Sequence, residues 1–157
     1  MLKPDVQHPR TRFLEPLAAL SAVAAPAIVN ARTGAVIATS AEVARTSRER
    51  RRGLLGRSGL PGGSALIIAR CNAIHTIGMR FAIDVAFVDA HGCVRKIVYR
   101  LPPRRLAISP RARVTIEFAA GELEARALRV GDRLTLAPSG LAKGAALDIP
   151  AVVSCGS

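Results

Sequence analysis

The most constraining feature of this sequence is the strict alternation of residues over 81–88. Large apolar side chains stand at every second position from Phe81 to Phe87, and Asp84 falls among the residues in between. A period of two is typical of a β-strand, because successive side chains of a strand point to opposite faces. The segment therefore predicts a strand with one bulky, buried face and with Asp84 on the opposite face.

Other short segments repeat this pattern, and turn-forming residues separate them. In one of them, 113–118, we expect the apolar residues to point inward and Thr115 and Glu117 to point outward. Many short strands joined by hairpin turns predict a mainly β fold, either a compact barrel-like or a sandwich-like antiparallel sheet. The further expected strands are 27–30, 35–39, 65–69, 93–99 and 133–137.

Two short helices are expected beside the strands. Thr46 is followed three residues later by Glu49, the spacing of a capping box, in which the two residues satisfy each other's backbone N–H groups. This predicts a helix near 46–56, with Gly56 as its left-handed end. A second short helix is expected near 121–128.

The length of 157 residues suits one domain with short extensions. Four prolines and no clear period over 1–26 indicate a loose leader, 27–137 form a single mostly β domain, and 138–157 form a tail rich in Gly, Ala and Pro. No apolar run reaches the roughly 20 residues of a membrane span. Three cysteines are too few for a disulfide framework, which favours a cytoplasmic protein, with export through the N-terminal segment as the alternative.

The formal net charge of +12 raises the question of nucleic-acid binding. Aromatic residues make up only 3% of the chain and Trp is absent, so the stacking platforms of many nucleic-acid binders cannot readily be built. We therefore expect no specific nucleic-acid partner. Weak electrostatic binding to nucleic acid or to an anionic surface is kept as an alternative.

The densest cluster of polar residues is 71–80, and it permits several interpretations. Cys71 and His75, with Asp84 as an orienting group, could form an enzyme or metal site. The same residues could simply satisfy backbone groups at the start of a strand. In a third interpretation, His75 joins Arg50 and Arg57 in a polar pocket that holds a small anion. Motifs of phosphate-binding loops, nucleophile elbows and zinc proteases are absent, so we expect no cofactor, no metal and no catalytic residue.

Several segments, taken in order, resemble a known family. They are TSRERRRGLLGR, CNAIHTIGMRFAIDVAFVDAHG, a double proline, VTIEFAAGE and VGDRL. Their order resembles the family called domain of unknown function 192 (DUF192) over about residues 30–136, which implies a small, mostly β protein without an established activity. Many members have a Phe-Trp-Met-Lys-Asn-Thr run where this chain has HTIGMR. The characteristic positions of the family correspond to Glu49, Arg50, Gly53, Leu54, Arg57, Met79, Ile83, Asp84, Phe87, Asp89, Gly92, Glu117, Gly121, Gly131 and Asp132.

The sequence thus predicts a non-enzymatic, mostly β domain with a polar pocket for a small anionic ligand or a protein partner. An enzyme or metal site that uses Cys71 and His75 with Asp84 is the alternative from another functional class. The residues predicted to bind the ligand are Arg50, Arg57, His75, Thr76, Met79, Asp84 and Asp132.

Overall fold

The computed structural model describes residue 13 and residues 25–138. The predicted leader (1–26) and tail (138–157) therefore lie outside the described residues, except for residues 13, 25, 26 and 138. Within the described part, no helix has the length and apolar character needed to cross a membrane.

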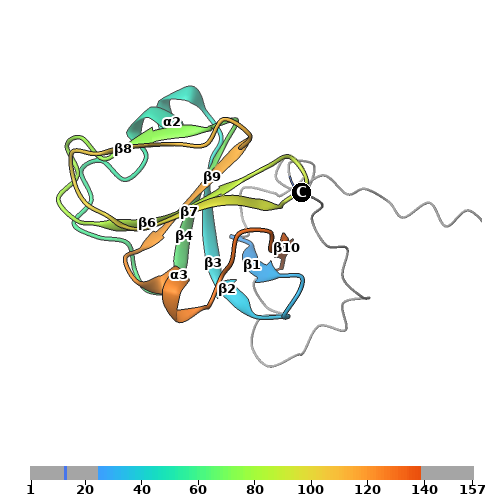
Figure 1. The fold of residues 1–157 in the computed structure, drawn as a ribbon. Coiled ribbons are helices and arrows are strands. Elements are labelled where there is room, and N and C mark those ends of the chain that lie inside the picture. The colour runs from blue at the N-terminus through green and yellow to red at the C-terminus, as the bar shows by residue number, and fades with distance from the viewer. Residues whose placement is uncertain (1–12, 14–24, 139–157) are drawn as a thin grey trace, which may run out of the picture.

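Short strands are the main regular structure of the described chain, and two short helices accompany them (Figure 1). This confirms the mainly β fold class. The helices are α2 (Ser47–Arg52) and α3 (Glu122–Ala125). The strands are β1 (Ala27–Asn30), β2 (Val36–Ala38), β3 (Ser40–Ala44), β4 (Ser64–Ala69), β5 (Ala73–His75), β6 (Ile83–Val88), β7 (Val94–Leu101), β8 (Leu106–Ile108), β9 (Val114–Ala119) and β10 (Leu134–Ala137).

A five-stranded sheet with the order β3-β4-β9-β6-β7 forms the centre of the fold. A three-stranded sheet, β10-β1-β2, packs on one face of it, and α2, the chain that follows α2, and the β5-β8 pair cover the other. The described strands form a layered, sandwich-like arrangement and not a closed barrel. Because both faces of the central sheet are covered, its middle strands β6 and β9 are buried along almost their whole length.

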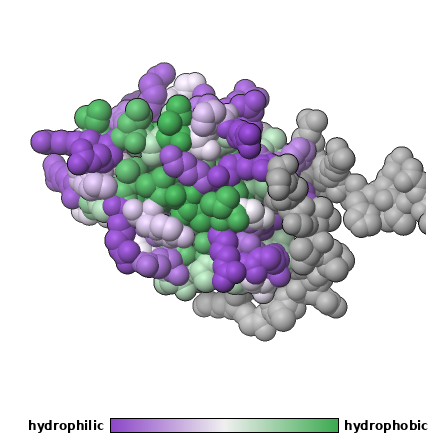
Figure 2. Space-filling view, viewed as in Figure 1, coloured by the Kyte–Doolittle hydropathy of each residue, from purple (hydrophilic) through white to green (hydrophobic). Residues whose placement is uncertain are grey.

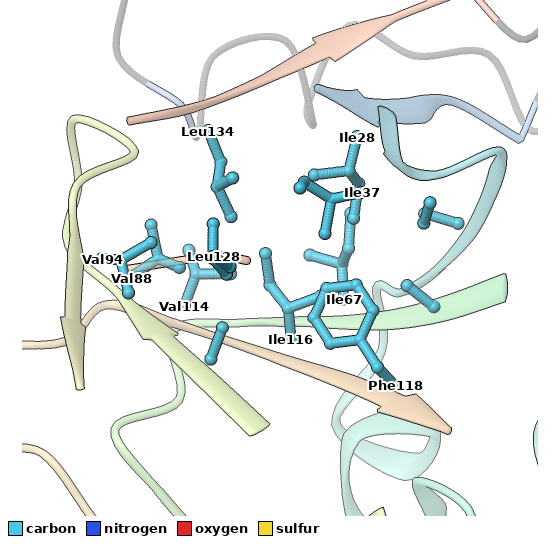
Figure 3. Packing of buried hydrophobic residues seen from close by; sticks show 14 of the residues in the cluster. Ile28, Ile37, Ile67, Val88, Val94, Val114, Ile116, Phe118, Leu128 and Leu134 are labelled. Atoms are coloured by element: carbon cyan, nitrogen blue, oxygen red, sulfur yellow. The ribbon is translucent and has the colours of Figure 1, made fainter. Parts of the chain in front are cut away.

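Two apolar cores lie on the two faces of the central sheet. In the first core, Ile28 and Ile37 of the small sheet pack toward Ile67, Ile116 and Phe118 of the central one (Figure 3). The second core is built from the alternate positions of the same strands, with side chains from the chain after α2 and from β5 and β8. It contains Leu54, Leu60, Leu66, Ile68, Ile74, Met79, Ile83, Val85, Phe87 and Ala107. Alternate side chains of each central strand therefore belong to different cores, as the period of two in the sequence requires.

The capping box at Thr46 is present as predicted. The Thr46 hydroxyl accepts from the Glu49 N–H at 3.1 Å, and the Glu49 carboxylate accepts from the Thr46 N–H at 2.8 Å. The helix is shorter than expected, because Gly53, with φ of +46°, ends it one turn before Gly56.

One strand pair departs from the predicted antiparallel arrangement. β3 and β4 are parallel, with Ser40 opposite Ser64 and Ala44 opposite Ile68. Parallel neighbours need a crossover connection, and α2 with the glycine-rich chain after it supplies one. This crossover carries α2 over the face of the second core.

Asp84 joins the central sheet to α3. It lies on the β6 face that packs on the first core, is fully buried, and accepts from three backbone N–H groups. The donors are Arg100 at 2.7 Å, Gly121 at 2.9 Å and Leu123 at 3.0 Å. The carboxylate thus satisfies N–H groups at the start of α3 and fixes the end of β7, which is a structural role.

The surface combines both kinds of side chain. Figure 2 shows hydrophobic surface in the middle of one face, with hydrophilic side chains around it. Leu106 and Ile108 of β8 are among the exposed large apolar residues. The hydrophilic residues form no single continuous platform on this face, so each basic side chain has to be judged by its local partners.

Replacing Asp84 by Ala should lower the free energy of unfolding by about 3 kcal/mol, because three backbone N–H groups lose their acceptor in a buried place. Urea denaturation measures this. Glu124→Ala, which removes an exposed carboxylate from α3, is the control and should change stability by only about 0.5 kcal/mol. Equal effects of the two substitutions would contradict the structural role of Asp84.

Candidate functional site

A cleft of about 560 Å³ opens beside α2 on the face of the second core. One side is formed by α2 and residues 53–55, and the other by the end of β4, the turn at Cys71 and strand β5. Ile68, Ile74 and Met79 give it an apolar lining, while charged residues of α2 and Arg70 add polar groups. Its size falls within the range of small-molecule sites in proteins.

Glu117 of β9 lies at the buried end of this cleft. Because Ile116 and Phe118 face the first core, Glu117 points to the other side of the sheet, among residues of the second core. Glu117 is buried, with only 4% of its surface exposed to solvent. The expected outward direction of Glu117 is wrong, because α2 and the chain after it cover that face of the sheet.

Within the described part of the chain, Oε2 of Glu117 is the single buried side-chain nitrogen or oxygen without a hydrogen-bond partner. Thr115, two residues earlier on the same face, is equally buried, but its hydroxyl donates to the Cys71 carbonyl at 3.0 Å. Buried polar atoms nearly always have partners, and exceptions need an explanation. The fold thus satisfies Thr115 and leaves the carboxyl of Glu117 available to the cleft.

The environment of Glu117 changes its acidity. Burial raises the pKa of its carboxyl to about 7, and the positive charge of Arg57 opposes this only in part. Removal from water disfavours the charged form of an acid, which explains the direction. Near neutral pH the carboxyl therefore exists in both the protonated and the ionised form.

Arginines line the outer part of the cleft. Arg50 donates to the Arg45 carbonyl at 3.0 Å and to the Ser47 hydroxyl at 2.8 Å. Among the described residues, no ion pair forms at Arg50 or at the three other arginines of the cleft, which are Arg51, Arg52 and Arg70. These three residues are exposed. The mouth of the cleft is therefore positively charged.

Arg70 adopts a backbone conformation that is rare for a residue with a side chain. Its φ is +54°, and it follows the last residue of β4 directly. The left-handed region costs a residue with a Cβ about 1 kcal/mol or more. Here it turns the chain from β4 toward β5, so that Arg70 and Cys71 both line the cleft.

Arg57 borders a neighbouring hollow of about 430 Å³, on the side of α2 that faces β3. Its guanidinium holds the Glu42 carboxylate with two hydrogen bonds of 2.7 and 3.0 Å. The hydrogen bonds from Arg57 lower the pKa of Glu42, although partial burial acts the other way. Arg57 is thus separate from the cleft lining and influences Glu117 through its charge.

The structure brings only some of the predicted ligand-binding residues together. Arg50, His75 and Met79 line the cleft, and Arg57 lies in the hollow beside it. Thr76 is buried at a chain crossing, where its hydroxyl donates to the Pro102 carbonyl at 2.7 Å and accepts from the Arg105 N–H at 2.9 Å. Neither Thr76 nor Asp84, which holds α3 on the other face of the sheet, is part of the cleft lining.

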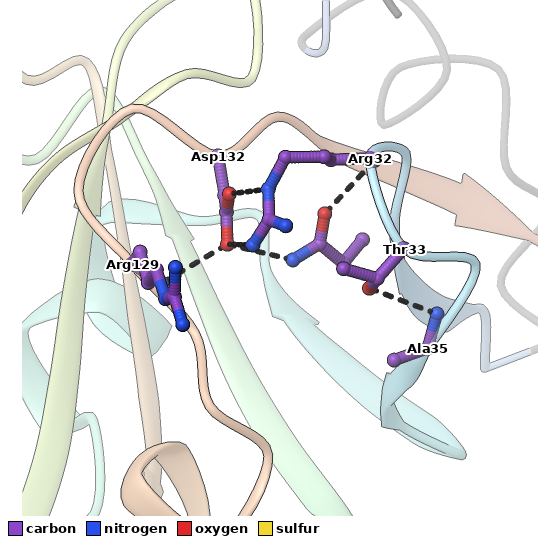
Figure 4. A network of polar contacts seen from close by, with 6 residues as sticks. Arg32, Thr33, Ala35, Arg129 and Asp132 are labelled. Atoms are coloured by element: carbon purple, nitrogen blue, oxygen red, sulfur yellow. Dashed lines mark hydrogen bonds and ion pairs between the residues drawn. The ribbon is translucent and has the colours of Figure 1, made fainter. Parts of the chain in front are cut away.

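Asp132 lies in a different network, beside the small sheet (Figure 4). Its carboxylate pairs with Arg32 and accepts from the Asn30 amide at 2.7 Å and the Arg129 N–H at 3.0 Å. Burial acts to raise the pKa of Asp132, but these hydrogen bonds outweigh it and keep the pKa below its usual value. The network ties the turn after β1 to the chain before β10, so Asp132 has a structural role.

The structure does not assemble the alternative enzyme site. Cys71 and His75 both line the cleft, but the Cys71 thiol donates to the Ala73 carbonyl at 3.1 Å. Asp84 is on the opposite face of the central sheet because it shares the β6 face of Ala86. Within residues 25–138, no three His, Cys, Asp or Glu side chains are placed so that they could hold a metal ion.

Glu117 is the site residue that the residue-by-residue reasoning missed. An alternating strand looks the same in sequence whether its second face meets water or a covering layer. The usable signals are its place between apolar residues in VTIEFA and its correspondence to a characteristic position of the resembled family.

Comparisons with known proteins support the fold. A family model, that of DUF192, described as uncharacterized ACR, matches residues 28–136 and confirms the resemblance predicted from the sequence. A protein of unknown function from Novosphingobium aromaticivorans has a similar structure, with 22% identity, a TM-score of 0.62, and coverage of 69% of this chain and 82% of its own. A "putative transcription regulator" from Sinorhizobium meliloti is also similar, with 18% identity, a TM-score of 0.65, and coverage of 74% and 98%. No curated protein matches the sequence.

Glu117 should make the protein less stable as the pH rises from about 5 to 7. The folded carboxyl keeps its proton up to a pKa of about 7, whereas the unfolded one loses it near 4.5. The stabilisation by this bound proton is complete below pH 4.5 and is lost as the pH rises through 7. Glu117→Gln removes this effect, so the variant should be more stable than wild type by about 3 kcal/mol at pH 8 and similar to it at pH 4.5.

Urea denaturation of both proteins across this pH range measures the difference. Glu124→Gln, at an exposed carboxylate, is the matched control for the substitution. A stability difference between Glu117→Gln and wild type that does not change with pH would contradict the assignment.

Proposed function

The chain belongs to the DUF192 family, whose activity is not established, and we propose from the geometry of its cleft that it is a binding protein for a small organic anion. The anion occupies the cleft beside α2 and meets the guanidinium groups at the mouth. The concave shape and the volume of about 560 Å³ favour a small molecule over a protein partner.

The distribution of charge in the cleft is the observation that carries this proposal. Four arginines line it, and none of them forms an ion pair among the described residues. Glu117 is the one acidic lining residue, and it is buried at the far end with a raised pKa. Outside the cleft, five described arginines form ion pairs, among them Arg57 with Glu42 and Arg32 with Asp132. The unpaired guanidinium groups thus lie beside a concave site.

Guanidinium groups suit this task because their planar donors match carboxylate and phosphate oxygens. Arg51 and Arg52 come from α2, and Arg70 comes from the end of β4. An anion in the cleft can therefore be contacted from two sides. The apolar side chains of Ile68 and Met79 offer a surface for the carbon part of the ligand.

The proposal predicts that Arg51→Ala and Arg70→Ala each weaken binding of propyl phosphate about tenfold, since each removes a charge-assisted hydrogen bond. Calorimetric titration of the full chain at low salt measures this, with butyrate and inorganic phosphate as further probes. Arg111→Ala, at an exposed arginine outside the cleft, is the control for the loss of one positive charge and should bind as wild type does. Failure of all three probes to bind, or equal effects of the three substitutions, would contradict the proposal.

A further inference from the structure

The two ends of the cleft call for different chemical groups. Resting on the proposed function, we infer that the ligand is a hydroxylated organic anion, whose charged group meets the arginines and whose hydroxyl bonds to the carboxyl of Glu117. Glu117 then determines which anions are preferred.

Other buried polar groups of the protein have hydrogen-bond partners within the chain. Asp84, Asp132 and Thr76 are as buried as Glu117, and each has several hydrogen bonds within the chain. Oε2 of Glu117 has none among the described residues. An unsatisfied buried oxygen at the end of a cleft is a ready acceptor for a group that a ligand brings.

Apolar side chains form part of the cleft lining together with Glu117. Leu54, Ile68, Ile74 and Met79 line the cleft beside Glu117, and the arginines are at its mouth. A ligand that spans this distance needs a carbon chain between its anionic group and its second polar group. Inorganic phosphate lacks such a chain and cannot use both ends.

A hydroxyl fits the buried end better than a second charged group does. It can donate to the ionised carboxyl and accept from the protonated one, so it bonds to Glu117 in either state. A second anion would be repelled by the ionised form. An ammonium group would have to leave water and lie near the positive charge of Arg57, which makes it costly.

Three matched phosphate monoesters test this inference. Propyl phosphate has no second polar group, 3-hydroxypropyl phosphate has a hydroxyl, and 3-aminopropyl phosphate has an ammonium. Titration of wild-type protein at pH 7 should show that the hydroxyl compound binds about tenfold more tightly than the other two, the gain of one buried hydrogen bond.

Two variants at Glu117 distinguish the effect of its hydrogen bond from the effect of the size of its side chain. Glu117→Leu should lose the preference for the hydroxyl compound over propyl phosphate. Glu117→Gln retains a carbonyl acceptor and an amide donor, so it should keep most of that preference. Melting temperatures and circular dichroism of both variants report whether the fold is intact.

The outcomes distinguish the two levels of the argument. If wild type binds propyl phosphate but shows no preference for the hydroxyl, the proposed function stands and this inference is overturned. Tightest binding of the ammonium compound, or a preference that persists in Glu117→Leu, overturns it as well. If none of the phosphates binds, the proposed function itself fails. A preference that is present in wild type, kept in Glu117→Gln and lost in Glu117→Leu supports the inference.

Discussion

The burial of both faces of the central sheet is the constraint on which the rest of this structure depends. Strands β6 and β9 lie in the middle of that sheet, so no position along them has free access to water. Every polar side chain in these strands must find a partner inside the protein or remain unsatisfied. Asp84 on one face and Glu117 on the other are both buried carboxyl groups that need hydrogen-bond partners, but only Asp84 is fully supplied with them. Asp84 is surrounded by backbone donors, whereas Glu117 faces a cleft.

The positive charge of the protein has more than one role. Several arginines serve the fold, since Arg32, Arg57 and Arg95 each hold a carboxylate of another segment. The arginines of the cleft have no such task in the described part of the chain. The net charge of +12 therefore says little by itself. Local pairing identifies the structural arginines, and a place in the cleft lining identifies the arginines that a ligand can reach.

Much of the fold could be predicted from local sequence patterns. The alternation over 81–88 predicted β6, and the Thr46 and Glu49 pair predicted the start of α2, because both signals act within a few residues. The parallel pairing of β3 with β4 was missed, since it depends on where a long crossover returns. The outward direction assigned to Glu117 was wrong for the same reason. Whether the second face of a strand meets water is decided by distant segments, here α2 and the chain after it.

The dependence on distant segments also explains which residues of the candidate site could be predicted from the sequence. Arg50, His75 and Met79 were recognised because they belong to dense local motifs, and they do line the cleft. Asp84 and Asp132 stand in equally dense motifs but satisfy backbone groups and neighbouring side chains. A local cluster of polar residues in the sequence thus cannot by itself distinguish a residue that stabilises the fold from one that faces a ligand. The separation requires knowing which polar atoms the fold has already satisfied.

Glu117 and Arg70 show this distinction most clearly. The carboxyl of Glu117 is held in an environment that disfavours its charge, and Arg70 takes a left-handed backbone conformation, one of four non-glycine residues with positive φ in the described part. Both features cost stability, and in the described structure neither gains a hydrogen bond or ion pair that offsets the cost. Both residues line the same cleft. Departures from what the fold alone requires are expected where function imposes its own requirement, and here they coincide in a single place.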